Sequence, residues 1–144
     1  MIEQDTVRLL RECDAGAKMG ISSIEDVLGH VRSDKLKTML TDCKREHEKL
    51  SSEIEERLRD YQDEGKEPPA IASVMSEMMT NFKLAVNESD ETITGLMTDG
   101  CDMGVKSLSR YLNQYKAADE VSKDIAKRLI QQEADLAVSI RPFL

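Results

Sequence analysis

The chain has 144 residues, of which 40% are hydrophobic, 33% charged and only 3% aromatic. This length fits one domain with its own core, and the composition favours amphipathic helices over strands, which are richer in aromatic and β-branched residues. The formal net charge of −8 opposes binding to nucleic acid or to anionic membranes.

The first long helix is predicted from Asp5 or Thr6, either of which can cap its start, to about Gly29 and His30. Its apolar residues recur with the alternating three- and four-residue spacing of a buried helix face. These residues are Leu10, Cys13, Ala17, Gly20, Ile24, Leu28 and Val31.

The second helix should begin after Ser33 as its N-cap, with Asp34 in its first turn. It should end near residues 63–65, because Pro68 and Pro69 cannot continue a helix. One face carries the clearest apolar stripe of the chain, interrupted by a single histidine. The stripe consists of Leu36, Leu40, Cys43, His47, Leu50, Ile54 and Tyr61, with Leu58 one step away.

Three further elements follow in the second part of the chain. Residues 71–86 have the pattern of a shorter connecting helix. Residues 87–90 should cap a third long helix that ends near Tyr115, and Asp119 should cap a fourth. The inward positions are Leu96, Cys101, Val105, Leu108, Leu112 and Tyr115 on the third helix, and Ile125, Leu129, Glu133, Leu136, Ile140 and Phe143 on the fourth.

The chain also repeats itself. The pattern Cys-Asp-x-Gly-x-Lys at residues 13–18 recurs at residues 101–106, an offset of 88, whereas Ser33 and Asp119, like His47 and Glu133, differ by 86. These offsets predict two antiparallel hairpins of common design, the second with a turn about two residues shorter. We therefore expect one all-α domain over residues 1–144, an up-and-down four-helix bundle. Its hairpins cover about residues 5–64 and 90–143, and a short crossover helix joins them.

Polar residues interrupt the apolar stripes at related places. His47 and Glu133 occupy equivalent inward positions, and Cys13 with Asp14 should match Cys101 with Asp102. Antiparallel pairing should bring His47 within about one helical turn of Cys13, and Glu133 close to Cys101. Helical bundles build di-metal sites from inward side chains of four facing helices.

This layout resembles the ferritin-like superfamily, and within it bacterial domains related to rubrerythrin-type bundles. The resemblance covers nearly the whole chain and is carried by residues 43–58, 65–68, 78–85 and 88–91, the last leading into the helix of Cys101. It implies a ferritin-like bundle in which iron or another transition metal could be held. The candidate metal ligands are Glu46, His47, Asp102, Glu133, Cys13 and Cys101.

The chain departs from the metal-binding pattern of that family. Glu-x-x-His occurs nowhere, since Glu46 is followed three places on by Lys49 and Glu133 by Leu136. A thiol or an ammonium group in place of a bridging carboxylate cannot hold two hard iron ions in the usual way. We therefore expect a degenerate metal site and no cofactor.

Simpler interpretations exist for each candidate. His47 could be a core histidine that bonds Glu133 or Asp14 and stays charged. Asp14 with Lys18, and Asp102 with Lys106, fit ion pairs four residues apart on a helix. The three cysteines fit small apolar fillers, and reduced thiols without a signal peptide indicate a cytoplasmic protein.

Three functions follow from these features. We favour a non-catalytic ferritin-like bundle with a binding role or a structural role in stress. The alternatives are a di-metal oxidoreductase or storage-type protein that uses Glu46, His47, Asp102 and Glu133, and a helical protein–protein interaction module. We expect neither nucleic acid nor membrane as a partner; a homodimer and a protein partner stay open.

Overall fold

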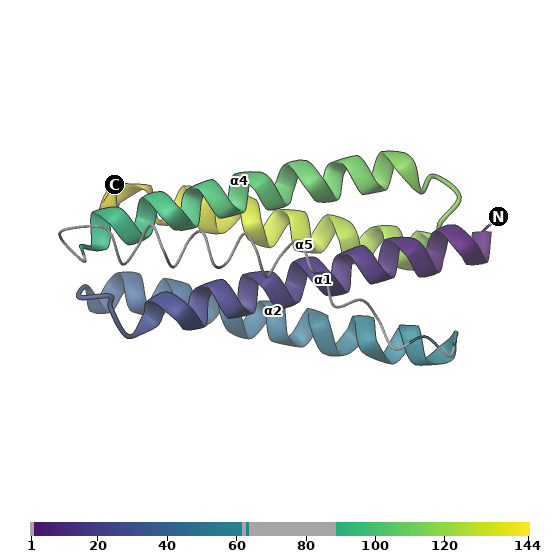
Figure 1. Cartoon of the computed structure of the whole chain (residues 1–144), viewed down its shortest axis with the longest axis horizontal. Coiled ribbons are helices and arrows are strands. Elements are labelled where there is room, and N and C mark those ends of the chain that lie inside the picture. The colour runs from purple at the N-terminus through teal and green to yellow at the C-terminus, as the bar shows by residue number, and fades with distance from the viewer. Residues whose placement is uncertain (1, 62, 64–88) are drawn as a thin grey trace.

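The computed structural model describes residues 2–61, 63 and 89–144. These residues form four α-helices, α1 (Ile2–Leu28), α2 (Asp34–Asp60), α4 (Asp90–Gln114) and α5 (Glu120–Ser139), followed by a 3₁₀ helix, η1 (Arg141–Phe143). The predicted all-α bundle of two antiparallel hairpins is confirmed: α1 packs along α2 and α4 along α5 (Figure 1). The predicted connecting helix over residues 71–86 lies outside the described residues.

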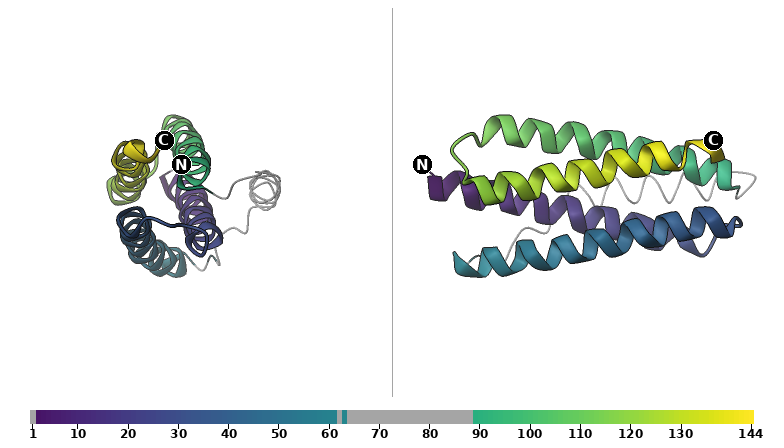
Figure 2. Two further views of the ribbon diagram at one scale, coloured as in Figure 1. Left: turned by 90° about the vertical axis from the view of Figure 1, so that its left-hand side faces the viewer. Right: turned by 180° about the vertical axis from the view of Figure 1, so that it is seen from behind.

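The two hairpins pack side by side, with α1 beside α4 and α2 beside α5, as the end-on view shows (Figure 2). The Ile2 end of α1 and the C-terminus lie at opposite ends of the bundle (Figure 1). Among the described helices, none combines the length and the apolar character that crossing a membrane requires.

The predicted N-caps Ser33 and Asp119 are confirmed, and Ser89, within the predicted capping stretch 87–90, caps α4. The side chains of Ser33, Ser89 and Asp119 each accept a hydrogen bond from a backbone N–H three residues on. Each bond satisfies one of the four amide groups that a helix start leaves without a partner. These local signals define the starts of α2, α4 and α5.

Two predicted helix ends are wrong. Helix α1 begins at Ile2, not at Asp5 or Thr6, and α2 ends at Asp60, about three residues before its predicted end. At the end of α2, the backbone N–H groups of Tyr61 and Asp63 both bond the Leu58 carbonyl. Tyr61 is half-buried there and packs against the apolar core.

Asp5 and Thr6 bond the opposite hairpin. The Asp5 carboxylate accepts from the Ala117 backbone N–H at 3.0 Å, and the Thr6 hydroxyl accepts from the Asp119 N–H at 2.8 Å. At the other end of the bundle, the Asp90 carboxylate accepts from the N–H groups of Arg32 and Ser33, at 2.8 and 2.9 Å. In each hairpin, an aspartate near the start of the first helix thus holds the turn of the other. We call these contacts the carboxylate braces.

The core consists of two apolar clusters, one toward each end of the bundle. One contains Leu9, Cys13, Ile54, Leu108 and Leu129 among its residues, and the other Ile24, Leu36, Ile93, Cys101 and Ile140. Burial of such side chains stabilises a fold by about 1.5–3 kcal/mol each. His47 and Glu133 are buried on the same faces of α2 and α5, in sequence between the leucines of the two clusters.

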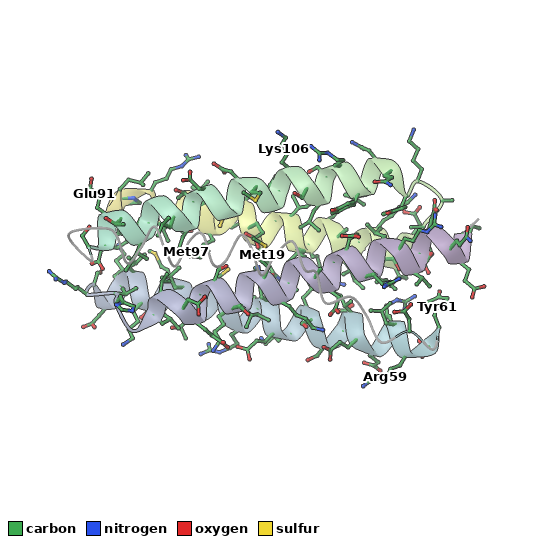
Figure 3. The ribbon with its side chains drawn as sticks, viewed as in Figure 1. Met19, Arg59, Tyr61, Glu91, Met97 and Lys106 are labelled. Carbon is green, nitrogen blue, oxygen red and sulfur yellow. The ribbon has the colours of Figure 1, made fainter. Side chains whose placement is uncertain are left out.

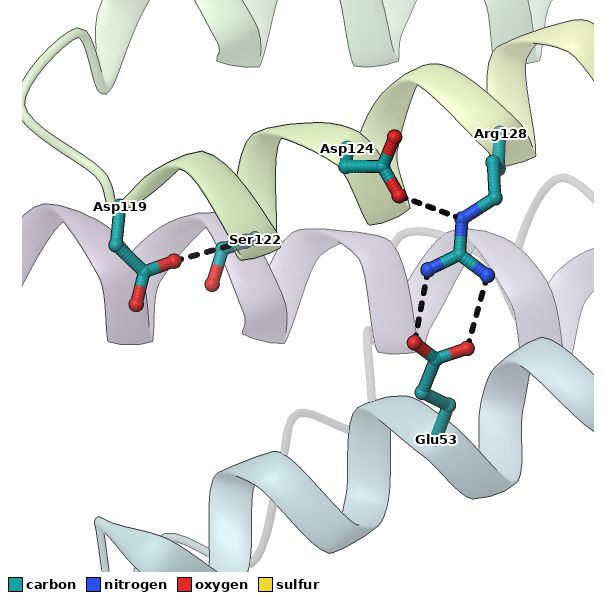
Figure 4. A network of polar contacts seen from close by, with 5 residues as sticks. All are labelled: Glu53, Asp119, Ser122, Asp124 and Arg128. Carbon is teal, nitrogen blue, oxygen red and sulfur yellow. Dashed lines mark hydrogen bonds and ion pairs between the residues drawn. The ribbon is translucent and has the colours of Figure 1, made fainter.

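An ion-pair network ties α2 to α5 at the surface. Both terminal nitrogens of Arg128 bond the two carboxylate oxygens of Glu53, at 2.8 and 2.9 Å, and Arg128 Nε bonds Asp124 at 2.9 Å (Figure 4). Because Arg128 donates to it, the pKa of the Glu53 carboxyl lies below its ordinary value. This network adds a lateral contact to the apolar packing of α2 against α5.

The structure also revises the register of the repeat. Burial in α4 matches burial in α1 best at an offset of 84, which pairs Leu9 with Ile93, Cys13 with Met97, Ala17 with Cys101 and Ile24 with Leu108. The two Cys-Asp-x-Gly-x-Lys copies are therefore not structurally equivalent, contrary to the prediction. Asp14 is fully buried whereas Asp102 is exposed, and Cys13 and Cys101 belong to different clusters.

Candidate functional site

The candidate site is centred on a buried ion pair between α2 and α5. His47 Nε2 lies 2.8 Å from Glu133 Oε1, and the side chains are 1% and 11% exposed. The two residues face each other because both interrupt the apolar stripes of adjacent helices. The predicted His47–Glu133 contact is thus confirmed.

Two glycines of the first helices let this pair approach the backbone. A Cβ atom on Gly20 of α1 would lie 2.6 Å from His47 Cδ2 and 2.8 Å from its Nε2. A Cβ atom on Gly104 of α4 would lie 3.5 Å from the carboxyl carbon of Glu133. Each hairpin therefore packs a glycine of its first helix against the polar residue of its second, and these positions again differ by 84 and 86.

This packing corrects two further expectations. His47 lies against Gly20, which is seven residues beyond Cys13 along α1, so it is about two helical turns from Cys13 rather than one. The span from glycine to polar residue is 27 residues in the first hairpin (47 − 20) and 29 in the second (133 − 104). The spans differ by two residues, but the turn of the second hairpin (115–119) has the same length as that of the first (29–33), so the predicted shorter turn is wrong.

The environment of His47 favours its charged form. Burial disfavours the imidazolium, but contacts with Cys43 and Glu133 outweigh this effect and raise the pKa of His47 from 6.5 to about 10. Cys43 lies one turn before His47 on α2, and its Sγ is 3.7 Å from His47 Nδ1. At neutral pH the pair is thus an imidazolium bonded to a carboxylate.

The buried cysteines are held as neutral thiols. Burial, together with the charges of Glu12 and Asp14, raises the pKa of Cys13 to about 12. Burial and the nearby Glu133 carboxylate also raise the pKa of Cys101. Glu133 and Cys101 line the same cavity, which confirms that they are close. Thiolates are the nucleophilic and metal-binding form of cysteine, so these two thiols suit apolar packing.

A cavity of about 260 Å³ opens beside the ion pair, between α1 and α4. His47, Glu133, Cys43 and Cys101 line it together with apolar side chains and glycines. Met19 of α1 and Met97 of α4 lie in the space between the two ribbons, whereas Lys106 lies on the outer edge of α4 (Figure 3).

The predicted metal ligands do not all meet at this cavity. His47, Glu133 and Cys101 line it. Cys13 does not; it packs instead in the apolar cluster that contains Leu9 and Ile54. Glu46 is exposed and bonds Lys49 at 3.3 Å, and Asp102 is exposed on α4. The described residues contain no group of three or more His, Cys, Asp or Glu side chains placed to hold a metal ion. They therefore do not fit a di-iron centre, which needs a cage of carboxylates.

Of the two predicted ion pairs, Asp14–Lys18 is confirmed. Lys18 Nζ lies 3.0 Å from Asp14 Oδ2 and 3.6 Å from Glu55 Oε1. Asp14 is fully buried, so this pair lies between the helices and not on the open helix surface as expected. The predicted Asp102–Lys106 pair is wrong: both residues are described and exposed, and no ion pair joins them.

The cavity and the glycines that line it were not predicted from the sequence. Gly16 and Gly20 on α1 line it together with Gly100 and Gly104 on α4, in the same relation to the repeat (100 − 16 = 104 − 20 = 84). Two glycines four residues apart on each of two helices are a signal visible in the sequence. The mismatched Cys-Asp-x-Gly-x-Lys register concealed it, because that alignment pairs Gly16 with Gly104.

Comparison with known proteins gives one family. Residues 5–114 match the model described as Domain of unknown function (DUF2383). No curated protein and no solved structure matches the chain.

Proposed function

The chain belongs to the DUF2383 family, and we propose that it is a ferritin-like bundle that acts as a small-molecule binding protein and not as a di-iron oxidoreductase. The observation that carries the proposal is the cavity between α1 and α4, with a closed His47–Glu133 pair on one side. Pockets that combine apolar walls with a few fixed polar groups are the usual form of ligand sites.

The ferritin-like placement is supported by the arrangement of the helices and by the position of the ion pair. Two antiparallel hairpins place one polar residue each, His47 and Glu133, at facing inward positions. In ferritin-like proteins such inward positions hold metal ligands. Here each partner satisfies the other, and Glu46 and Asp102 point elsewhere, which supports a binding role without di-iron chemistry.

Metal analysis separates this proposal from the oxidoreductase alternative. We expect elemental analysis of the purified protein to find transition metal far below one equivalent, and no oxidation of added Fe(II) above the buffer rate. A near-stoichiometric metal that is lost in His47→Gln and retained in the exposed control Glu48→Gln would instead establish the metal-binding alternative.

A binding test addresses the cavity directly. The protein is incubated with a small-molecule extract of cells and analysed by native mass spectrometry. We expect a retained adduct on the original chain and none on Gly100→Leu, whose new side chain would occupy the cavity. An adduct retained by Gly100→Leu, or none on the original chain, would overturn the proposal. A cytoplasmic location, a stress-associated role and a homodimer stay predictions of the sequence.

A further inference from the structure

We propose that the cavity between α1 and α4 binds an uncharged aromatic molecule. This inference rests on the binding function proposed above and specifies the class of ligand. The inference follows from three features of the cavity: its volume, the charges of its lining residues, and the apolar side chains of its walls.

The space is large enough for a ring. Ordinary protein interiors contain few voids larger than a water molecule, whereas this cavity measures about 260 Å³. Gly16 and Gly20 of α1 and Gly100 and Gly104 of α4 line it. A Cβ atom built on Gly100 would meet no atom of the described residues within 4 Å, so a larger side chain has room at this position of the cavity wall.

The charges on the lining disfavour an ionic ligand. Of the described residues that line the cavity, Glu12, His47 and Glu133 are charged, and none is lysine or arginine. The His47 imidazolium is bonded to Glu133 at 2.8 Å, so among the described lining residues an anion would meet two carboxylates and no available cation. A cationic ligand would have to compete with His47 for Glu133 and with the existing partner of Glu12. In either case the ligand would lose water without gaining a new partner.

The walls favour an aromatic ring. Met19, Met97 and Met103 all line the cavity, with Ile24 and Leu108. Methionine adapts to irregular shapes, and its sulfur makes favourable contacts with aromatic rings. Glycine lets a ligand approach the backbone closely, so a flat ring fits between the two helices better than a bulky aliphatic group does.

Indole and its charged derivatives test this class of ligand. The protein contains no tryptophan, so the fluorescence of added indole can be followed when it is excited at the long-wavelength edge of its absorption, where tyrosine absorbs little. We expect indole to bind at least about tenfold more tightly than tryptamine, a cation, or indole-3-acetate, an anion, because both would have to lose the hydration of a charge.

Two variants of α4 locate the binding. Gly100→Leu should weaken indole binding at least about tenfold by filling the cavity. Gly95→Leu is the matched control, because its Cβ would also meet no atom of the described residues within 4 Å but Gly95 does not line the cavity. It should bind indole as the original chain does. Circular dichroism and urea denaturation would confirm that both variants are folded.

The results separate the class of ligand from the binding function itself. Equal or tighter binding of tryptamine or indole-3-acetate, lost in Gly100→Leu, would overturn the uncharged class and leave the binding function in place. The protein could also fail to bind indole and still carry a cellular adduct that Gly100→Leu abolishes. That result would overturn the uncharged aromatic class and leave the binding function in place. Indole binding that Gly100→Leu does not change would refute this cavity as the site. No adduct and no indole binding would refute both proposals.

Discussion

Gly20 is the residue whose substitution the candidate site should tolerate least. Gly20→Ala would place a methyl group 2.6 Å from His47 Cδ2, so the ring or the helix must shift. Overpacking of this kind costs about 1–3 kcal/mol and outweighs the gain of up to about 1 kcal/mol in helix propensity. Urea denaturation should therefore show a lower free energy of unfolding.

Gly104→Ala is the matched control for this prediction. Its methyl group would lie 3.5 Å or more from Glu133, an ordinary contact distance, so the gain of about 0.5–1 kcal/mol in helix propensity should prevail. Equal effects of the two substitutions would mean that Gly20 does not support the ion pair.

The charged state of His47 makes stability depend on pH. Its pKa is raised from 6.5 to about 10 on folding, so the contribution of the ion pair is fully present below pH 6.5. It is lost as the pH rises through about 10. One pKa unit corresponds to about 1.4 kcal/mol, and the free energy of unfolding should fall by at least this amount across the interval.

NMR titration of the His47 ring measures the same property directly. The signal of its Cε1–H should change with a midpoint well above pH 8. A midpoint near 6.5 would contradict the charged pair. His47→Gln should remove the extra decrease in stability between pH 6.5 and 10.

The two kinds of residue in the site differ in how far they could be predicted. His47 and Glu133 were predicted to meet, because a polar residue in an apolar stripe is visible in the sequence and must find a buried partner. Gly20 was placed on the inward face, but its contact with the ring was not predicted. That contact depends on how closely α1 approaches α2, and the spacing of residues along one helix does not contain this distance.

Between helices, the contact of Arg128 with Glu53 should make a small, measurable contribution. The side chains are 44% and 40% exposed, so solvent screens the pair, although its geometry is bidentate. A double-mutant cycle with Arg128→Gln and Glu53→Gln should give a coupling energy of about 0.5–1 kcal/mol that decreases in high salt.

The surface pair of Arg45 and Asp42 provides a comparison within one helix. Its atoms are 3.4 Å apart, and both side chains are more than 60% exposed. The same cycle on Arg45 and Asp42 should give a coupling energy near zero. A coupling as large as that of Arg128 with Glu53 would show that the contact between α2 and α5 has no special weight.

Helix starts could be predicted where the signal is local. Ser33, Ser89 and Asp119 cap the helices that follow them, because each side chain bonds an amide three residues away. Asp5 and Thr6 have the same chemistry, yet they bond Ala117 and Asp119 more than 110 positions away. Asp5 and Thr6 were predicted to cap their own helix, because contacts with the other hairpin depend on the tertiary packing and not on the local sequence.

Across the bundle, the two carboxylate braces should contribute independently. Asp90→Ala removes two hydrogen bonds to a charged acceptor and Asp5→Ala removes one, so each should lower the free energy of unfolding, by about 1–3 kcal/mol, with the larger effect at Asp90. The braces lie at opposite ends of helices about 40 Å long. The effects should therefore add to within about 0.5 kcal/mol in the double variant.

Asp102→Ala, on the exposed face of α4, is the control for these changes and should alter stability by less than about 0.5 kcal/mol. A double variant much less stable than the sum would show that the braces act together, for example by holding one cooperative rotation of the hairpins.

The repeat was predicted as a feature of the fold, but its register was not. A match of four residues over six positions at an offset of 88 favoured that register, whereas burial and the glycine contacts agree at 84. The two alignments differ by four residues, which is close to one helical turn. Both therefore place apolar residues inward, and only contacts between helices distinguish them.

The His47–Glu133 pair has a consequence for how α2 and α5 find each other. Leucine and isoleucine recur along both helices, so sliding one past the other by a turn would still place aliphatic groups together. Such a slip would strand an imidazole and a carboxyl group in hydrocarbon, each without its hydrogen-bonding mate. One ion pair near the middle of α2 and α5 thereby selects one longitudinal alignment of these helices from the several that apolar packing alone would permit.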